Sequence, residues 1–142
     1  MKTVEEIITM LGGVEGLYVS IENPPLMRLV IEHIGGGPHG LPAVSVAHYY
    51  EVNGDLCQDP EMCFEIEVTP DGFAFHPYMF QMAIPPVYQE VTNDAPGAGL
   101  AEQLRQFAAM WDANLRAQGF IEAAQRQRVA ALRDRAGKEE RS

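Results

Sequence analysis

AVSVAHYYEVNGDLCQDPEMCFEIEV, residues 43–68, is the stretch whose pattern best defines the fold. Apolar and polar residues alternate over 43–52 and again over 62–68, which predicts two strands, each with one apolar face. Asn53-Gly54 is a strong signal for a tight turn between paired strands. The polar segment 53–61 is interpreted as two successive turns, at Asn53-Gly54 and at Asp59-Pro60, before the second strand begins. The stretch therefore predicts two neighbouring antiparallel strands.

Further strands are expected on both sides of this pair. Residues 26–34 read as a strand that ends in the glycine-rich segment 35–40, and residues 73–82 follow a turn at 70–72. Pro77 favours an edge position or a bulge, because proline has no N–H to give to a ladder. Shorter β-favouring stretches occupy 17–21 and 84–91. Strands joined by short turns predict an antiparallel β-meander of four to five strands.

Helices are predicted at both ends of the chain. Thr3 and Glu6 form a capping box, and apolar residues then recur at helical spacing until Gly12-Gly13. A second apolar stripe at steps of four and three comprises Leu100, Leu104, Phe107, Trp111 and Leu115. Gly119 separates this helix from another over 120–136. We therefore expect an α+β fold in which the N-terminal helix and the C-terminal helices pack on one face of the meander.

The chain has the size of one domain, since 142 residues bury a core without staples. It contains no internal repeat and no long linker, so we expect a single α+β domain over 1–136 and a frayed tail over 137–142. No apolar run approaches the roughly 20 residues that span a bilayer, and the N-terminus lacks a secretory pattern. These features predict a cytoplasmic protein with no membrane association, in which Cys57 and Cys63 are reduced thiols.

Charge is distributed unevenly along the chain. Residues 1–104 contain two basic and fifteen acidic residues, a charge of −13, and residues 105–142 contain eight basic and five acidic residues, a charge of +3; together they make the net −10. An anionic body disfavours direct nucleic-acid binding and favours a cationic protein surface as partner. The C-terminal arginines are interleaved with acidic residues and lack aromatic neighbours for base stacking.

The sharpest candidate surface is a row of carboxylates around the two strands. Glu65 and Glu67 project from one face of a strand, about 7 Å apart by strand rise, with Glu51 expected opposite on the neighbouring strand. This spacing is close to that of phosphates along a nucleic-acid strand, so the row is able to mimic a phosphate backbone; a merely solvated sheet face is the alternative. The predicted partner-binding residues are Glu51, Asp55, Asp59, Glu61, Glu65 and Glu67.

Other chemistry is represented only by weak patterns. Oxygen ligands over 55–61 suit a hard cation, but their spacing does not match a helix-flanked calcium loop. His48 shares a predicted strand face with Val44 and Val46, which favours a sheet-face histidine over a ligand or a partner for a nucleophilic cysteine. The glycine-rich segment lacks the lysine or helix that completes a phosphate site. We therefore assign no catalytic residue, metal or cofactor.

Residues 48–65, HYYEVNGDLCQDPEMCFE, resemble the signature of an uncharacterised domain family found in proteins of bacterial plasmids, integrative elements and phages. The signature reads H-Y-Y-x-x-N-G-D-x-x-x-D-P-E-M-x-F-E, and the resemblance extends over 26–91. The matching positions are His48, Tyr49, Tyr50, Asn53, Gly54, Asp55, Asp59, Pro60, Glu61, Met62, Phe64 and Glu65. Some relatives carry the domain beside antirestriction-type modules. The resemblance implies a mobile-element setting and no particular reaction.

The function expected from these observations is that of a non-enzymatic acidic accessory protein of a mobile genetic element. It would bind a protein partner with a basic surface, such as a nucleic-acid-handling or defence complex, as in counter-defence. Two alternatives remain open. One is a small metal-dependent, enzyme-like domain centred on His48 and the segment 55–61. The other is a structural or oligomerisation domain that forms a homodimer through its C-terminal helices.

Overall fold

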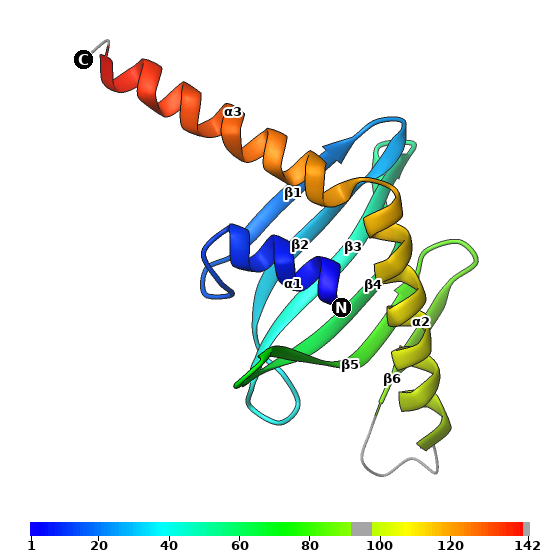
Figure 1. Cartoon of the computed structure of the whole chain (residues 1–142). Coiled ribbons are helices and arrows are strands. Elements are labelled where there is room, and N and C mark those ends of the chain that lie inside the picture. Colours follow the sequence, from blue (N-terminus) through cyan, green and yellow to red (C-terminus); the bar gives the residue numbers. More distant parts are fainter. Residues whose placement is uncertain (92–97, 141–142) are drawn as a thin grey trace.

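The computed structural model describes residues 1–91 and 98–140. One helix, a six-stranded sheet and two further helices follow one another along the chain (Figure 1). The helices are α1 (Lys2–Met10), α2 (Ala98–Ala117) and α3 (Phe120–Glu140). The strands are β1 (Tyr18–Asn23), β2 (Leu26–Gly36), β3 (Pro42–Val52), β4 (Asp55–Thr69), β5 (Gly72–Met82) and β6 (Val87–Glu90). The α+β class is therefore as predicted.

The sheet is an antiparallel meander in which each strand pairs with the next along the chain, in the order β1 to β6. It has six strands rather than the four to five that we predicted. The two short stretches at its ends both form strands, because β1 pairs with β2 over its whole length and β6 pairs with the end of β5. Backbone hydrogen bonds to a longer adjacent strand stabilise a short stretch that would not form a strand alone.

β4 begins at Asp55, so the turn predicted at Asp59-Pro60 is wrong, whereas the turn predicted at Asn53-Gly54 is confirmed. Only Asn53 and Gly54 turn the chain, both with positive φ, and the residues after them pair with the end of β3. The register shifts between Ala47 and Tyr49, opposite the part of β4 that contains Pro60. Such a shift accommodates a residue without an N–H. The bulge expected at Pro77 also occurs, where β4 and β5 change register next to Phe64.

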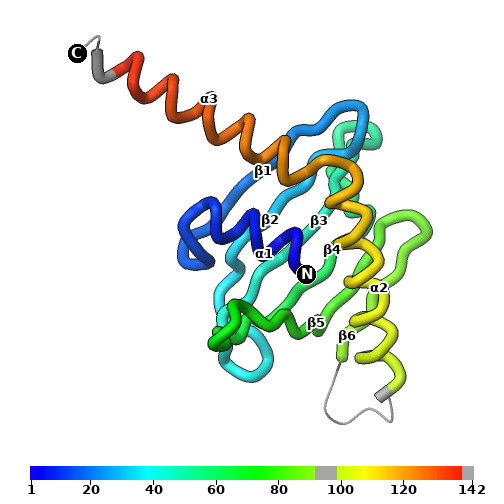
Figure 2. The backbone as a smooth tube through the Cα atoms, in the orientation of Figure 1, coloured from blue at the N-terminus to red at the C-terminus, as the bar shows by residue number. Residues whose placement is uncertain are grey.

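α1 and α2 cover one face of the sheet, as Figure 2 shows in the backbone trace. Their apolar stripes pack on the central strands to form the core. Fully or almost fully buried members of this core are Val4, Ile7, Ile8, Val44, Val46, Met62, Phe64, Leu104, Trp111 and Leu115. The predicted packing of helices on one face is confirmed for α1 and α2.

α3 packs differently from the other helices. Its first turns bury Phe120, Ala123 and Ala124, whereas Val129 and Leu132 further along are exposed. The rest of the helix projects past β1, away from the sheet (Figure 1). The helix continues to Glu140, into the region where we expected a frayed tail, and residues 141–142 lie outside the described part of the chain.

The capping box predicted at Thr3 is not formed. α1 begins at Lys2, and Thr3 is a buried residue within the first turn. Its backbone N–H donates to both carboxylate oxygens of Asp112 on α2 at 3.1 Å, and the N–H of Val4 donates to Oδ1 at 3.3 Å. The hydroxyl of Thr3 donates to the backbone oxygen of Asp112. A carboxylate from another helix therefore caps α1.

Candidate functional site

The face of the sheet that α1 and α2 leave uncovered carries most of the predicted carboxylates. Strand residues alternate between faces, and Val44, Val46, Phe64 and Ile66 point into the core. Their neighbours therefore point to the other side, which we call the open face. Register places one row across all six strands on this face, composed of Tyr18, Glu32, Ser45, Cys63, Met79 and Glu90.

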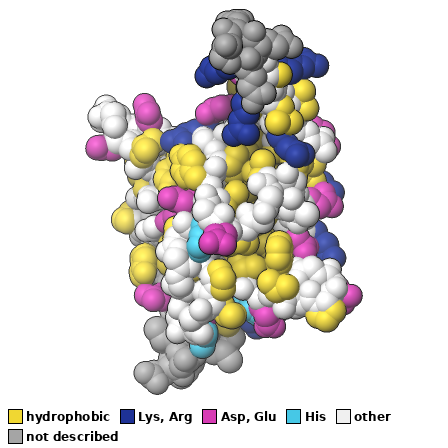
Figure 3. Space-filling view, turned by 90° about the vertical axis from the view of Figure 1, so that its left-hand side faces the viewer, with side chains coloured by type: hydrophobic (Ala, Val, Ile, Leu, Met, Phe, Trp, Pro, Cys, Tyr) yellow, Lys and Arg dark blue, Asp and Glu magenta, His cyan; other side chains and the backbone are white. Residues whose placement is uncertain are grey.

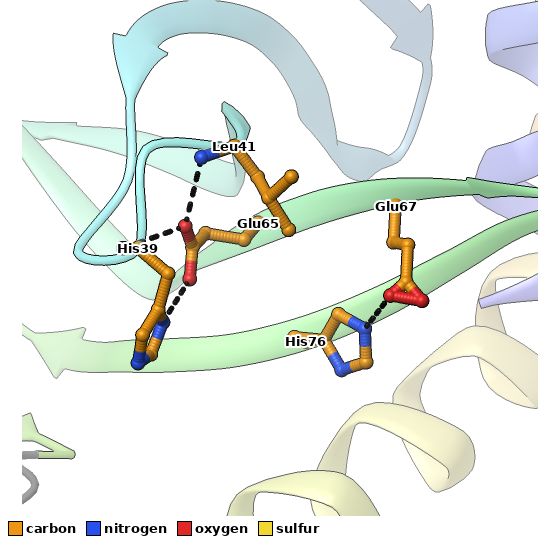
Figure 4. Close-up of polar contacts among 5 residues, drawn as sticks. All are labelled: His39, Leu41, Glu65, Glu67 and His76. Atoms are coloured by element: carbon orange, nitrogen blue, oxygen red, sulfur yellow. Dashed lines mark hydrogen bonds and ion pairs between the residues drawn. The ribbon is translucent and has the colours of Figure 1, made fainter.

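Glu65 is on this face but is only 3% exposed. Its carboxylate accepts hydrogen bonds from the backbone N–H groups of His39, at 2.9 Å, and Leu41, at 3.2 Å. Nδ1 of His39 lies 2.7 Å from its other oxygen (Figure 4). Burial by itself raises the pKa of Glu65, but the hydrogen bonds from His39 and Leu41 lower the pKa on balance. Glu65 therefore holds the loop before β3 and is not presented to a partner.

Glu67, two residues further along β4, is on the same side of the strand and is half exposed. Its carboxylate lies 3.6 Å from Nε2 of His76 on β5 (Figure 4). An ion pair at this distance between exposed groups holds neither side chain firmly. Glu67 is therefore accessible to a partner in a way that Glu65 is not.

Glu61 is half-buried and already engaged on the open face. Its Oε2 accepts a hydrogen bond from the Ser45 hydroxyl at 2.5 Å, and its Oε1 accepts one from the side-chain amide of Gln81. These contacts join β3, β4 and β5. Glu61 contributes negative charge to the face, but its hydrogen bonds hold neighbouring strands together.

Glu51 and Asp55 lie at the β3–β4 hairpin end, and both are exposed. Glu51 pairs with Leu56 and not with the segment that contains Glu65 and Glu67, so the expected continuous row is wrong. The error follows from the length of β4: because the strand starts at Asp55, Glu51 faces its beginning. Asp59 is half-buried where the register shifts.

Two exposed carboxylates of the open face, Glu32 on β2 and Glu90 on β6, were not among the predicted partner-binding residues. Glu32 pairs with Ser45 on one side and Tyr18 on the other. The continuous apolar run Leu29–Ile31 hides the face on which Glu32 lies, and β6 is too short to show a period of two. Arg28 is the single Lys or Arg in the six strands; it donates to the Ser20 hydroxyl at 3.1 Å and stacks over the Tyr49 ring.

His48 lies on the core side of the sheet and is only 8% exposed. Its ring packs against Trp111 and Phe120, with centroids 5.7 and 5.5 Å away, and Nδ1 donates to the backbone oxygen of Arg28 at 3.2 Å. Burial lowers the pKa of His48, and the hydrogen bond to Arg28 only partly offsets this effect. His48 is therefore a neutral core residue that also lines a small pocket of about 210 Å³.

The groups of the metal or nucleophile hypothesis do not converge. His48 points to the core side, whereas Glu61 and Cys63 point to the open face, and Asp55 is at the hairpin end. Burial and the charge of Glu61 raise the pKa of the Cys63 thiol to about 12, so it is protonated at neutral pH. Within residues 1–91 and 98–140, no three His, Cys, Asp or Glu side chains are grouped to hold a metal ion.

The two cysteines both lie in β4, six residues apart. Strand rise separates them by about 20 Å, which is too far for a bridge within the chain. Both thiols are free.

The C-terminal helices supply two further surfaces. The α2 stripe predicted as a dimer seam packs into the chain's own core through Leu104, Trp111 and Leu115, so it does not present a free seam. Most Lys and Arg side chains visible in Figure 3 gather around α3 at the top of the view, and Asp and Glu are scattered over the body below.

In the described part of the chain, no helix has the length and apolar character needed to cross a membrane.

Comparison with known proteins places this architecture in a family. A model described as "Domain of unknown function (DUF6908)" matches residues 2–121. The chain belongs to this family. The matched region contains α1, the whole sheet and α2, and it ends at the second residue of α3, so nearly all of that helix lies outside the match. No curated protein and no solved structure matches the chain significantly.

Proposed function

We propose that this chain is a non-enzymatic accessory protein that binds a protein partner with a basic surface through the open face of its sheet. The observation that carries the proposal is the imbalance of exposed charge on that face. Glu32, Glu51, Glu67 and Glu90 are exposed there, whereas Arg28 is already engaged by Ser20 and Tyr49. Exposed carboxylates attract and orient a cationic partner at separations up to about a Debye length.

The shape of the open face supports a protein partner. Six strands about 4.8 Å apart place Glu32 on β2 and Glu90 on β6 about 19 Å from each other, a span typical of a standard interface. Tyr18 and Tyr88 are exposed on β1 and β6, at the two edges of the sheet. Tyrosine is enriched at protein interfaces because it offers a large apolar ring with a polar tip.

The partner class follows from charge and from the family resemblance. The similarity of residues 48–65 to proteins of plasmids, integrative elements and phages supports a role in a mobile genetic element. A nucleic-acid-handling or defence complex presents the basic groove that an acidic sheet would occupy, so counter-defence by mimicry of a phosphate backbone is the specific form of this proposal. The family description names no activity.

The test is affinity capture from host-cell lysate with wild type and a Glu32→Lys/Glu90→Lys variant, eluted over a salt series. The variant leaves Glu65 and Glu61 intact, so it changes exposed charge without cutting the hydrogen bonds that hold the strands and the loop. A Glu102→Lys/Glu122→Lys variant carries the same charge change on the helices and is the matched control.

We expect wild type and the control to retain one basic protein that high salt releases, and the open-face variant to lose it. The retained protein would then be purified and titrated directly against all three chains. Equal retention by the open-face variant and by the control would refute the open face as the binding surface. No salt-sensitive partner for any form would refute the proposal as a whole.

A further inference from the structure

An apolar pocket lies at the end of the sheet where β3 begins. It has a volume of about 440 Å³, and its lining is almost entirely apolar. Six of its lining residues are apolar or proline and one is acidic: Val14, Leu41, Pro42, Ile66, Glu67, Val68 and Phe73. The volume is within the range of sites that accept small molecules or the anchor side chains of a partner.

The walls of this pocket are held in place by hydrogen bonds. The N–H of Leu41 donates to the buried carboxylate of Glu65, and the N–H of Phe73 donates to Oε1 of Glu5 at 2.7 Å. Val68 and Phe73 also face each other across the β4–β5 ladder. A pocket whose backbone is tethered on two sides loses little conformational entropy when it is filled.

One wall presents a large apolar side chain to water. Val68 is 78% exposed, the highest exposure among the large hydrophobic residues of the described chain. Burying such a side chain against another apolar group is favourable in proportion to the area removed from water. Burial of an apolar side chain of a partner in this pocket would therefore stabilise the complex.

Acidic residues neighbour this apolar site. Glu67 is among its lining residues, although its carboxylate lies on the open face beside His76, and the carboxylate of Glu5 accepts the N–H of Phe73. Glu15 follows Val14, Asp71 lies in the turn before Phe73, and both are exposed. None of the lining residues is Lys or Arg. An apolar centre with a charged rim is the usual anatomy of a protein-binding hot spot, and here the rim has one sign.

We infer that this pocket receives one aliphatic side chain of the basic protein partner, from a segment in which lysine or arginine flanks that residue. The inference rests on the proposed function, because it assigns one and the same cationic partner to the open face and to the pocket. The apolar anchor supplies affinity and specificity, while the carboxylates orient the segment and accelerate its association.

The test uses two synthetic peptides, one with a leucine between lysines and one with serine in place of that leucine. Each is titrated into wild type, Val68→Ser and Val129→Ser while backbone amide chemical shifts are followed. Val129→Ser is the matched control, because it also replaces an exposed valine but lies on α3, away from the pocket. The exposed strand position of Val68 keeps the loss of fold stability small.

We expect wild type and Val129→Ser to bind the leucine peptide about tenfold more tightly than the serine peptide, with shifts at Val14, Leu41 and Val68. Val68→Ser should lose that preference and retain salt-sensitive binding of the serine peptide. Equal binding of both peptides to wild type, or an unchanged preference in Val68→Ser, would contradict the role of the pocket as an anchor site but not partner binding by the acidic open face. Failure of both peptides to bind wild type would overturn the proposed function as well.

Discussion

Glu65 is the residue whose environment most changes the interpretation of this molecule. A carboxylate that is almost fully buried and accepts two backbone hydrogen bonds and a contact from Nδ1 of His39 serves as a structural anchor. Removing such an acceptor leaves buried donors without partners, which costs more than the hydrogen bonds contributed. The neighbouring Glu67 is half exposed and lacks this role.

Replacing Glu65 by glutamine should destabilise the fold by about 1–3 kcal/mol, because a neutral amide oxygen accepts the two backbone N–H groups less strongly than a carboxylate and the amide nitrogen cannot accept from Nδ1 of His39. Chemical denaturation measures the loss, and amide hydrogen exchange at His39 and Leu41 should become faster than in wild type. Glu67→Gln is the control and should stay within about 0.5 kcal/mol of wild type. Equal effects of the two substitutions would contradict the anchoring role.

The same variant has a distinct pH dependence. The net lowering of the pKa of Glu65 means that its ionised form contributes stability that is present above the unfolded-state pKa and is lost as the pH falls through the folded-state pKa. The difference in unfolding free energy between wild type and Glu65→Gln should therefore shrink from about pH 5 downward. A difference that stays constant into the acid range would show that the carboxylate charge is irrelevant.

At the scale of elements, two side chains on the C-terminal helices connect them to distant parts of the chain. Asp112 on α2 caps the first turn of α1, and Gln127 on α3 binds the outer edge of β1. The amide of Gln127 donates to the backbone oxygen of Ser20 at 2.7 Å and accepts from the N–H of Glu22 at 3.2 Å. These are the two bonds that a further strand would make, so the helix protects the edge of the sheet.

Asp112→Ala should cost about 1–3 kcal/mol, because the N–H groups of Thr3 and Val4 lose their acceptor in a buried position. Denaturant unfolding gives the free energy, and hydrogen exchange at Thr3 and Val4 locates the loss in α1. Asp134→Ala, an exposed position on α3, is the control. Loss of protection spread evenly over the sheet, with α1 unaffected, would contradict the capping role.

Gln127→Ala should expose the edge of β1 and promote association between molecules at high concentration. The loss of folding free energy should be modest, about 0.5–1 kcal/mol, since both hydrogen bonds are exposed to solvent. Light scattering over a concentration series measures the association, with Gln125→Ala on the same helix as control. Identical scattering from the two variants would refute edge protection by Gln127.

The whole molecule combines an acidic body with a cationic projecting helix. The body is the part matched by the family model, and α3 beyond its first turns carries exposed arginines (Figure 3). Because Phe120, Ala123 and Ala124 make the buried contacts of α3, the later residues of this helix contribute little to the core. We therefore expect the body to fold without the later residues of α3.

Deleting residues 128–142 should leave the body folded, with a melting temperature within about 4 °C of the full chain, the shift produced by about 1 kcal/mol in a domain of this size. The deletion retains Gln127 and removes Arg128 and Leu132, which line a pocket together with Leu11 and Gly12. Calorimetry and circular dichroism are the measurements. A cooperative loss of structure in the truncated chain would show that α3 is an integral part of the domain core. Sedimentation of the full and truncated chains tests separately whether α3 mediates a homodimer.

Local patterns were sufficient for the strands and helices, because side-chain periodicity is set by the backbone geometry of each element. They failed where an element depends on a partner: residues 55–61 contain turn-forming residues, yet they pair with β3 and form the start of β4. They also failed at Thr3, whose N–H finds its acceptor 109 residues away on Asp112.

The sequence by itself determined the α+β class, the meander and the excess of carboxylates over basic residues in the body. Only the tertiary structure decided which of those carboxylates reach solvent. Glu65 and Glu67 share one side of one strand, but the loop 26 residues earlier in the chain folds over Glu65 alone and donates its N–H groups to it. Exposure is a property of contacts between distant segments, and no local pattern of residue types records them.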